Sequence, residues 1–220
     1  MLVQTLGAIA LLALGVKANI REKRAGVAFF PPINDTSDGG SQLDSAGFPL
    51  NVIISALSSP KVLTDNGFLN YVSSFSTNCL DISLGAYQSS NLGDGNGEVS
   101  QTLPLFFNFG NDELGFCYGS QIGGKSFSFY RQNGLDHGTG ALFLAAADME
   151  DVEERRVMRP SGFNTGRDAF VAAATAGAST FDGVTYSTTT EDVTGLLPAG
   201  IAGQGIAQDG VVKLLTVTIT

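Results

Sequence analysis

The sequence has no tryptophan, one histidine, two cysteines and few charged side chains. With so few cysteines and histidines, the chain cannot build the usual structural zinc clusters or a histidine-rich metal site. Charged residues make up 15% of the chain, against roughly 25% in an average soluble domain, which excludes a charge-rich disordered segment or a coiled coil. Basic residues are scarce as well. The net charge of -9 argues against nucleic acid or an anionic membrane as a partner.

Long hydrophobic runs are also missing near the N-terminus. The apolar run Leu6 to Val16 has 11 residues, whereas a membrane-spanning helix needs about 20. A small residue, Ala18, follows where a signal peptidase would cut, and a polar, basic stretch comes next. We therefore predict a secretory signal peptide over residues 1–18, and a secreted, extracellular protein that is not held in a membrane once the signal is removed. The alternative is an N-terminal core helix.

A dibasic pair, Lys23 and Arg24, lies just after the predicted signal peptide. It resembles the site cut by kexin-type processing proteases, whose acidic pockets recognise paired positive side chains. We predict a short propeptide, residues 19–24, that is removed by cleavage after Arg24. The alternative is a basic stretch that is merely solvated.

Export would place Cys79 and Cys117 in an oxidising compartment, where two thiols of one chain usually pair. Neither cysteine has a basic neighbour that would activate its thiol. We therefore predict a structural disulfide, worth about 4 kcal/mol in the chain-entropy estimate, rather than a reactive free thiol. Asn34 begins the single Asn-x-Ser/Thr sequon, so we predict N-glycosylation there. We expect residues 25–47 to form an exposed polar segment.

The rest of the chain, residues 48–220, indicates a single β-rich domain, because no internal repeat and no long linker divides it. Alternating or continuous apolar residues bounded by glycine turns predict its strands. The predicted strands are Phe48 to Leu57, Leu80 to Ala86, Val99 to Phe109 (an edge or bulged strand because of Pro104), Phe127 to Phe129, Leu142 to Ala147, Val184 to Tyr186 after the Asp182-Gly183 turn, and Leu215 to Ile219.

Two further segments carry turn or helix signals. Thr165 to Asp168 resembles a capping box, and the alanine-rich run Ala169 to Ala176 before a glycine predicts a helix. Asp65-Asn66-Gly67 favours the tight turn of a hairpin; the alternative is a helix beginning near Pro60 with Ser59 as its cap. We predict a mainly β fold, a sandwich or barrel of short, mostly antiparallel strands with one or two small helices.

The segment Gly93 to Glu98 resembles the middle of a calcium-binding loop. An EF-hand needs a carboxylate at its first position and a bidentate glutamate at its twelfth. Here leucines at positions 92 and 103 stand in those places, so the segment is not an EF-hand. A different oxygen site, formed by Asp94, Asn96 and Glu98, is the weaker alternative. We favour a glycine-rich turn between the strands at 80–86 and 99–109, and we expect no cofactor. Ca²⁺ is the one candidate ion for the alternative oxygen site.

Candidate catalytic residues are few. His137 is the only histidine, so a serine or cysteine mechanism would depend on it. Both cysteines are predicted to be bonded and the sequence has no Gly-x-Ser-x-Gly elbow, so we expect His137 to be a turn residue within Gly134 to Gly140.

Paired carboxylates would suffice for glycoside hydrolysis. The densest acidic cluster is Asp148, Glu150, Asp151, Glu153 and Glu154, which Arg155, Arg156 and Arg159 follow. Its i,i+4 charge spacing favours a solvated helical turn. The lack of tryptophan also weakens a glycan-binding interpretation, although tyrosines could replace indole rings.

Several short stretches resemble small secreted fungal proteins, a group with no assigned activity. They are Phe48-Pro-Leu-Asn-Val, Val62 to Phe68, Ser76 to Cys79, Gly93 to Gly97, Arg131 to Gly134, Gly140 to Leu144, Gly166 to Asp168 and Gly195 to Pro198. The resemblance covers most of the mature chain and implies export and the dibasic cut. It implies nothing about mechanism.

We therefore expect a secreted, non-enzymatic protein that acts at a cell wall, a host or a partner surface, with no catalytic residue assigned. The alternative is a secreted, carboxylate-based hydrolase acting on polysaccharide. Such an enzyme would need a cleft with two carboxylates about 5 to 10 Å apart.

Overall fold

An eight-stranded sheet is the main element of the computed structural model, which describes residues 26–34, 39–78, 88–102, 105–108, 124–149, 161–200 and 206–220. The strand order is β2-β5-β6-β7-β1-β10-β9-β8, and β3 and β4 form a separate two-stranded sheet. In chain order the elements are the 3-10 helix η1 (Pro32–Asn34), β1 (Val52–Ile54), α1 (Asp65–Ser73), β2 (Thr77–Asn78), β3 (Ser89–Asn91), β4 (Glu98–Ser100), β5 (Leu105–Asn108), β6 (Gly124–Arg131), β7 (Leu142–Met149), α3 (Gly162–Thr175), β8 (Ser179–Phe181), β9 (Val184–Thr194) and β10 (Val211–Ile219).

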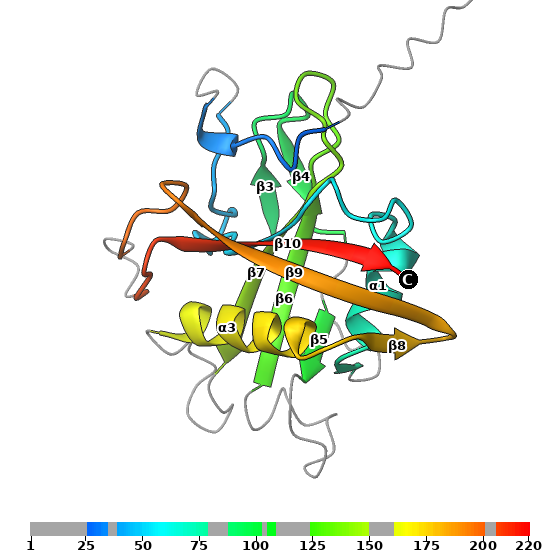
Figure 1. The fold of residues 1–220 in the computed structure, drawn as a ribbon. Helices are drawn as coiled ribbons and strands as arrows, with labels where there is room; N and C mark the ends of the chain where they lie inside the picture. The colour runs from blue at the N-terminus through cyan, green and yellow to red at the C-terminus, as the bar shows by residue number, and fades with distance from the viewer. Residues whose placement is uncertain are drawn as a thin grey trace, which may run out of the picture.

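The large sheet is strongly curled. In Figure 1 the β9–β10 pair crosses in front of β6 and β7 at a steep angle, so the sheet forms a half-barrel. Among the described strand pairs, β1 and β10 are parallel and the other pairs are antiparallel. The prediction of a mainly β fold with few helices and mostly antiparallel strands is confirmed.

The C-terminal strands follow directly from their residue pattern. Leu215 and Val217 are fully buried, and the threonines that alternate with them point to the other face of β10. The turn between β8 and β9 consists of Asp182 and Gly183, whose φ angles are 48° and 72°. Two residues with positive φ form the tight hairpin turn that suits twisted strands. The predicted turn at this position is confirmed.

The two helices that the structure describes, α1 and α3, pack on the concave side of the curled sheet. Phe68 and Tyr71 of α1 pack with Phe127 of β6 and Phe170 of α3 in one buried cluster. In α3, Gly166 lies directly on the backbone of β7: a Cβ atom there would lie 2.3 Å from the carbonyl carbon of Ala147. Glycine therefore permits the close approach of this helix to the sheet.

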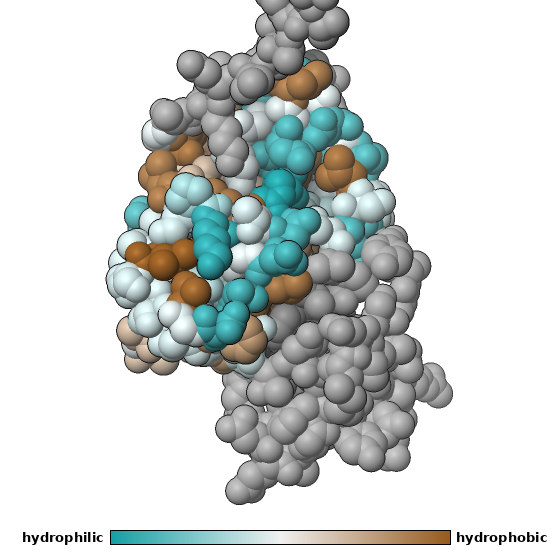
Figure 2. All heavy atoms as spheres, turned by 90° about the vertical axis from the view of Figure 1, so that its right-hand side faces the viewer, coloured by the Kyte–Doolittle hydropathy of each residue, from teal (hydrophilic) through white to brown (hydrophobic). Residues whose placement is uncertain are grey.

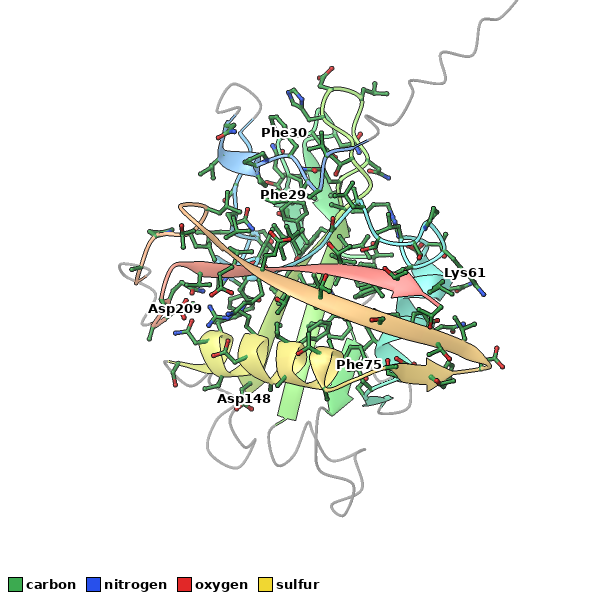
Figure 3. All side chains as sticks on the ribbon, viewed as in Figure 1. Phe29, Phe30, Lys61, Phe75, Asp148 and Asp209 are labelled. Carbon is green, nitrogen blue, oxygen red and sulfur yellow. The ribbon has the colours of Figure 1, made fainter. Side chains whose placement is uncertain are left out.

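A second buried cluster includes residues of the other face of the sheet, and Ala28, Phe29 and Leu43 of the N-terminal segment pack against it. This segment also joins the fold through a buried glutamine. The side chain of Gln132 accepts a hydrogen bond from the backbone N–H of Phe30 (2.9 Å) and donates one to its C=O (2.8 Å). Figure 3 shows Phe29 and Phe30 at the end of the sheet near β3 and β4. Gln42 and Asp44 are also buried. Residues 26–34 and 39–47 are thus packed in part against the domain, which corrects the expectation of an exposed polar segment.

The structure corrects the hairpin predicted at Asp65-Asn66-Gly67. These residues open the helix α1, and Thr64 is its N-cap, with the hydroxyl oxygen accepting from the Gly67 N–H. The competing helix prediction was right in type, although that helix starts later than Pro60. Glycine at position 67 permits the start of α1 to lie against the backbone of Lys61, because a Cβ atom there would lie 1.7 Å from the Lys61 carbonyl oxygen.

Two other boundaries differ from the predictions. The run from Val99 to Phe109 was predicted as one strand, but β4 and β5 belong to different sheets. The helix predicted to start at Thr165 to Asp168 and to run through Ala176 is α3. It begins at Gly162, three residues earlier than Thr165, and it ends at Thr175, close to the predicted stop at Gly177. Leu142 to Ala147 and Phe127 to Phe129 lie in β7 and β6.

Several predicted features lie outside the described residues. They are Ala18, Lys23, Arg24, Cys79, Cys117, the strand at 80–86 and residues 150–160 of the acidic cluster. In the described part of the chain, neither helix has the length and apolarity needed to span a bilayer.

Candidate functional site

A polar groove with a volume of about 480 Å³ lies where α1, the β3–β4 hairpin and the end of β6 meet. This volume is within the range of small-ligand sites, roughly 300 to 1,000 Å³. Six of the seven lining residues have a polar or charged side chain. The lining consists of Asp65, Asn96, Val99, Ser100, Thr102, Arg131 and Asn133.

One ion pair joins two walls of the groove. The Arg131 guanidinium at the end of β6 donates to the carboxylate of Asp65 in the first turn of α1. The Arg131 side chain is 20% exposed and that of Asp65 53% exposed. Asp65 also suits its position because a negative charge is favourable at a helix N-terminus. The two formal charges of the lining therefore compensate each other.

A buried carboxylate holds the two loops on one side of the groove together. Asp94, 2% exposed, accepts hydrogen bonds from the backbone N–H groups of Gly134 (2.6 Å) and Asn96 (3.2 Å). Its own backbone C=O accepts from the N–H groups of Asp136 (2.9 Å) and His137 (3.2 Å). A single residue of the β3–β4 turn thereby fixes the turn between β6 and β7.

The same two loops meet again at the groove surface. The Asn96 amide nitrogen donates to the Asn133 side-chain oxygen over 2.8 Å. The loops approach closely because Gly134 lacks a side chain: a Cβ there would lie 2.1 Å from the Asp94 carbonyl oxygen. The amide groups of Asn96 and Asn133 therefore lie side by side at the surface of the groove, on two loops that Asp94 holds together.

The predicted cation ligands have different roles. The Asp94 carboxylate caps backbone N–H groups, Asn96 bonds Asn133, and Glu98 is exposed on β4. In the parts of the chain that the structure describes, no three His, Cys, Asp or Glu side chains gather in a way that could hold a metal ion. The turn interpretation of Gly93 to Glu98 is confirmed, but the turn joins β3 to β4 rather than starting from a strand at 80–86.

His137 lies in the turn between β6 and β7, as predicted. Its ring stacks on Phe30, with the centroids 3.8 Å apart and the planes 6° from parallel. This contact adds to the attachment of the N-terminal segment by Gln132. The histidine ring thus contacts an aromatic side chain of the N-terminal segment.

Among the residues that the structure describes, Asp65 is the one carboxylate lining the groove, and it is ion-paired with Arg131. A glycosidase needs a pair of carboxylates. Three of the tyrosines that could stack on a sugar, Tyr71, Tyr130 and Tyr186, are buried. The predicted glycosylation acceptor Asn34 is exposed at the end of η1, which an acceptor requires.

On the face of the molecule that carries α1 and the tip of the β8–β9 hairpin, a band of hydrophilic residues runs between patches of hydrophobic residues (Figure 2). Arg131 and Asp65 were not predicted as site residues, because they lie 66 positions apart and meet only through the fold. The one signal of the groove in the sequence was Arg131, which follows the alternating residues at the end of a predicted strand.

Comparisons with protein-family models, curated proteins and solved structures find no match to this chain.

Proposed function

We propose that this chain is a secreted, non-enzymatic protein that acts at a cell-wall, host or partner surface by holding a ligand in the polar groove. The observation that carries this proposal is the composition of the groove. Among the described residues, its lining has one carboxylate, which is already ion-paired with an arginine, and no histidine or cysteine. Such a lining is equipped to form hydrogen bonds with a ligand. The hydrolase alternative requires two carboxylates, and the described part of the lining supplies one.

Export is part of the same proposal. The apolar run at 6–16, the small residue Ala18 and the pair Lys23-Arg24 support a signal peptide and a short propeptide. A mature chain starting at Ala25 would begin just before the segment that Gln132 and His137 anchor. We also propose the Cys79–Cys117 disulfide and a glycan on Asn34 as parts of the mature product.

Mass spectrometry of the secreted product, intact and after reduction, tests the export proposal. We expect an N-terminus at Ala25, a gain of two hydrogens on reduction and a sugar mass on the peptide containing Asn34. A product recovered inside the cell with Met1 attached and both thiols free would contradict it.

Retention on surface material tests the groove. The secreted protein is mixed with isolated cell walls, and the bound fraction and the soluble sugar released are both measured. We expect Arg131→Ala to lower the bound fraction severalfold. Lys213→Ala is the matched control because it removes a comparable exposed ion pair, with Asp192, away from the groove. Sugar release that depends on the protein would favour the hydrolase instead.

A further inference from the structure

We infer that the ligand of the groove is a neutral, hydroxyl-rich glycan chain rather than an acidic glycan, a nucleotide or a basic peptide. This inference rests on the proposed function and names the chemical class that the groove would recognise.

The charge of the lining favours a neutral ligand. Arg131 and Asp65 compensate each other, and the other five lining residues carry no charge. The whole chain has a net charge of -9, so an anionic ligand would approach against repulsion. A cationic ligand would find one carboxylate in the groove, and that carboxylate already has an arginine partner.

The polar groups of the lining match neighbouring hydroxyl groups. A guanidinium, a carboxylate and two amides each have hydrogen-bonding atoms in one plane. One atom of each group is used in the Arg131–Asp65 and Asn96–Asn133 pairs, and the other atoms of these groups can bond neighbouring hydroxyls of a sugar ring. The hydroxyls of Ser100 and Thr102 both donate and accept, and Val99 offers an apolar contact for the C–H face of a ring.

The sequence has no tryptophan, so the lining would have to recognise a sugar through contacts other than stacking on an indole ring. The lining residues that the structure describes include no aromatic side chain, so recognition by this lining depends on hydrogen bonds. That arrangement requires fixed partners, because the cost of ordering flexible side chains is subtracted from affinity. Asn96 and Asn133 bond each other, and Asp94 fixes the backbone of both loops behind them. The two amides are therefore ordered before a ligand arrives.

Isothermal titration calorimetry with defined hexasaccharides tests the inference. The probes are neutral chains of glucose, mannose or N-acetylglucosamine and an acidic chain of galacturonic acid. We expect at least one neutral chain to bind about tenfold or more tightly than the acidic chain, with little dependence on salt. Tighter binding of the acidic chain, or no binding of any neutral chain at millimolar concentration, would overturn the inference.

Variants show whether the groove is the site. Asn133→Ala should weaken binding of the neutral chain about tenfold, whereas Lys213→Ala should leave it unchanged. Thr102→Val removes one hydroxyl at almost constant volume and should weaken binding severalfold. It serves as the test if Asn133→Ala does not fold. Unchanged binding in a folded groove variant would contradict the site. If the protein is retained on walls but binds no neutral chain, the glycan inference fails and the proposed function stands.

Discussion

The guanidinium of Arg167 forms two parallel hydrogen bonds with the carboxylate of Asp209, Nη1 to Oδ1 at 2.7 Å and Nη2 to Oδ2 at 2.8 Å. Arg167 is 3% exposed and also donates to the C=O of Val211 at the start of β10. Figure 3 shows Asp209 beside the first half of α3. These hydrogen bonds therefore hold α3 to the start of β10.

Arg167→Ala should lower the free energy of unfolding by about 2 kcal/mol, because it removes the buried guanidinium whose charged hydrogen bonds join Asp209 and the Val211 C=O to α3. Urea unfolding of the purified protein measures this change. Lys213→Ala is the control: its exposed ion pair with Asp192 should contribute about 0.5 kcal/mol or less. Equal effects of the two substitutions would contradict a structural role for Arg167.

Asp44 and Asp209 should make the free energy of unfolding change with pH in opposite directions. Burial raises the pKa of Asp44 above its ordinary value of 3.8, although the backbone N–H groups of Phe48 and Ala46 partly oppose this. The folded state then holds this proton more tightly, so stability rises as pH falls through the raised pKa toward 3.8. The hydrogen bonds from Arg167 lower the pKa of Asp209. Its contribution is present above 3.8 and is lost as pH falls toward the lowered pKa.

Urea unfolding between about pH 7 and pH 2 checks both signs. Asp44→Asn keeps an oxygen that can accept from the two backbone N–H groups and should remove the rise on mild acidification. Asp209→Asn should remove part of the fall at lower pH. The prediction for Asp44 is wrong if the wild-type protein and Asp44→Asn show parallel pH profiles above pH 3.8.

Gly166→Ala should be severely destabilising, by about 3 kcal/mol or more, because the added methyl group would collide with the backbone of β7. Thermal or urea unfolding measures the loss. Ala172→Ser adds one atom at an exposed position of the same helix and should change stability by about 0.5 kcal/mol or less. Full stability of Gly166→Ala would mean that α3 and β7 are farther apart than described.

Calcium should not stabilise the protein, because the Asp94 carboxylate is occupied by backbone N–H groups. We expect the same Tm with millimolar Ca²⁺ and with a chelator, since a bound ion would raise stability by mass action. A rise in Tm with Ca²⁺ that Glu98→Gln abolishes would restore the oxygen site of Asp94, Asn96 and Glu98.

Local patterns were sufficient to predict the strands and turns that depend on neighbouring residues. The alternation along β10 and the Asp182-Gly183 turn are examples, since period and positive φ are properties of a few adjacent residues. Asn66-Gly67 shows where such reasoning fails. In this sequence the glycine is required by the approach of the Lys61 carbonyl, not by a positive φ, and a contact of this kind has no signature in the sequence.

The groove could not be predicted because its walls come from distant parts of the chain. Asp65 belongs to a helix and Arg131 to the end of β6, and only the order of the strands brings them together. The glycines of the 93–97 turn predicted its shape but not its partner. The partner is the β6–β7 turn, which Asp94 binds through Gly134.

The most direct test of binding without turnover is to saturate the protein with the tightest hexasaccharide and analyse the sugar after a day. We predict that all of the hexasaccharide is recovered intact while the groove is occupied. Shorter products that increase with protein concentration, and that disappear in Asp65→Asn, would contradict the account and make the groove an active site.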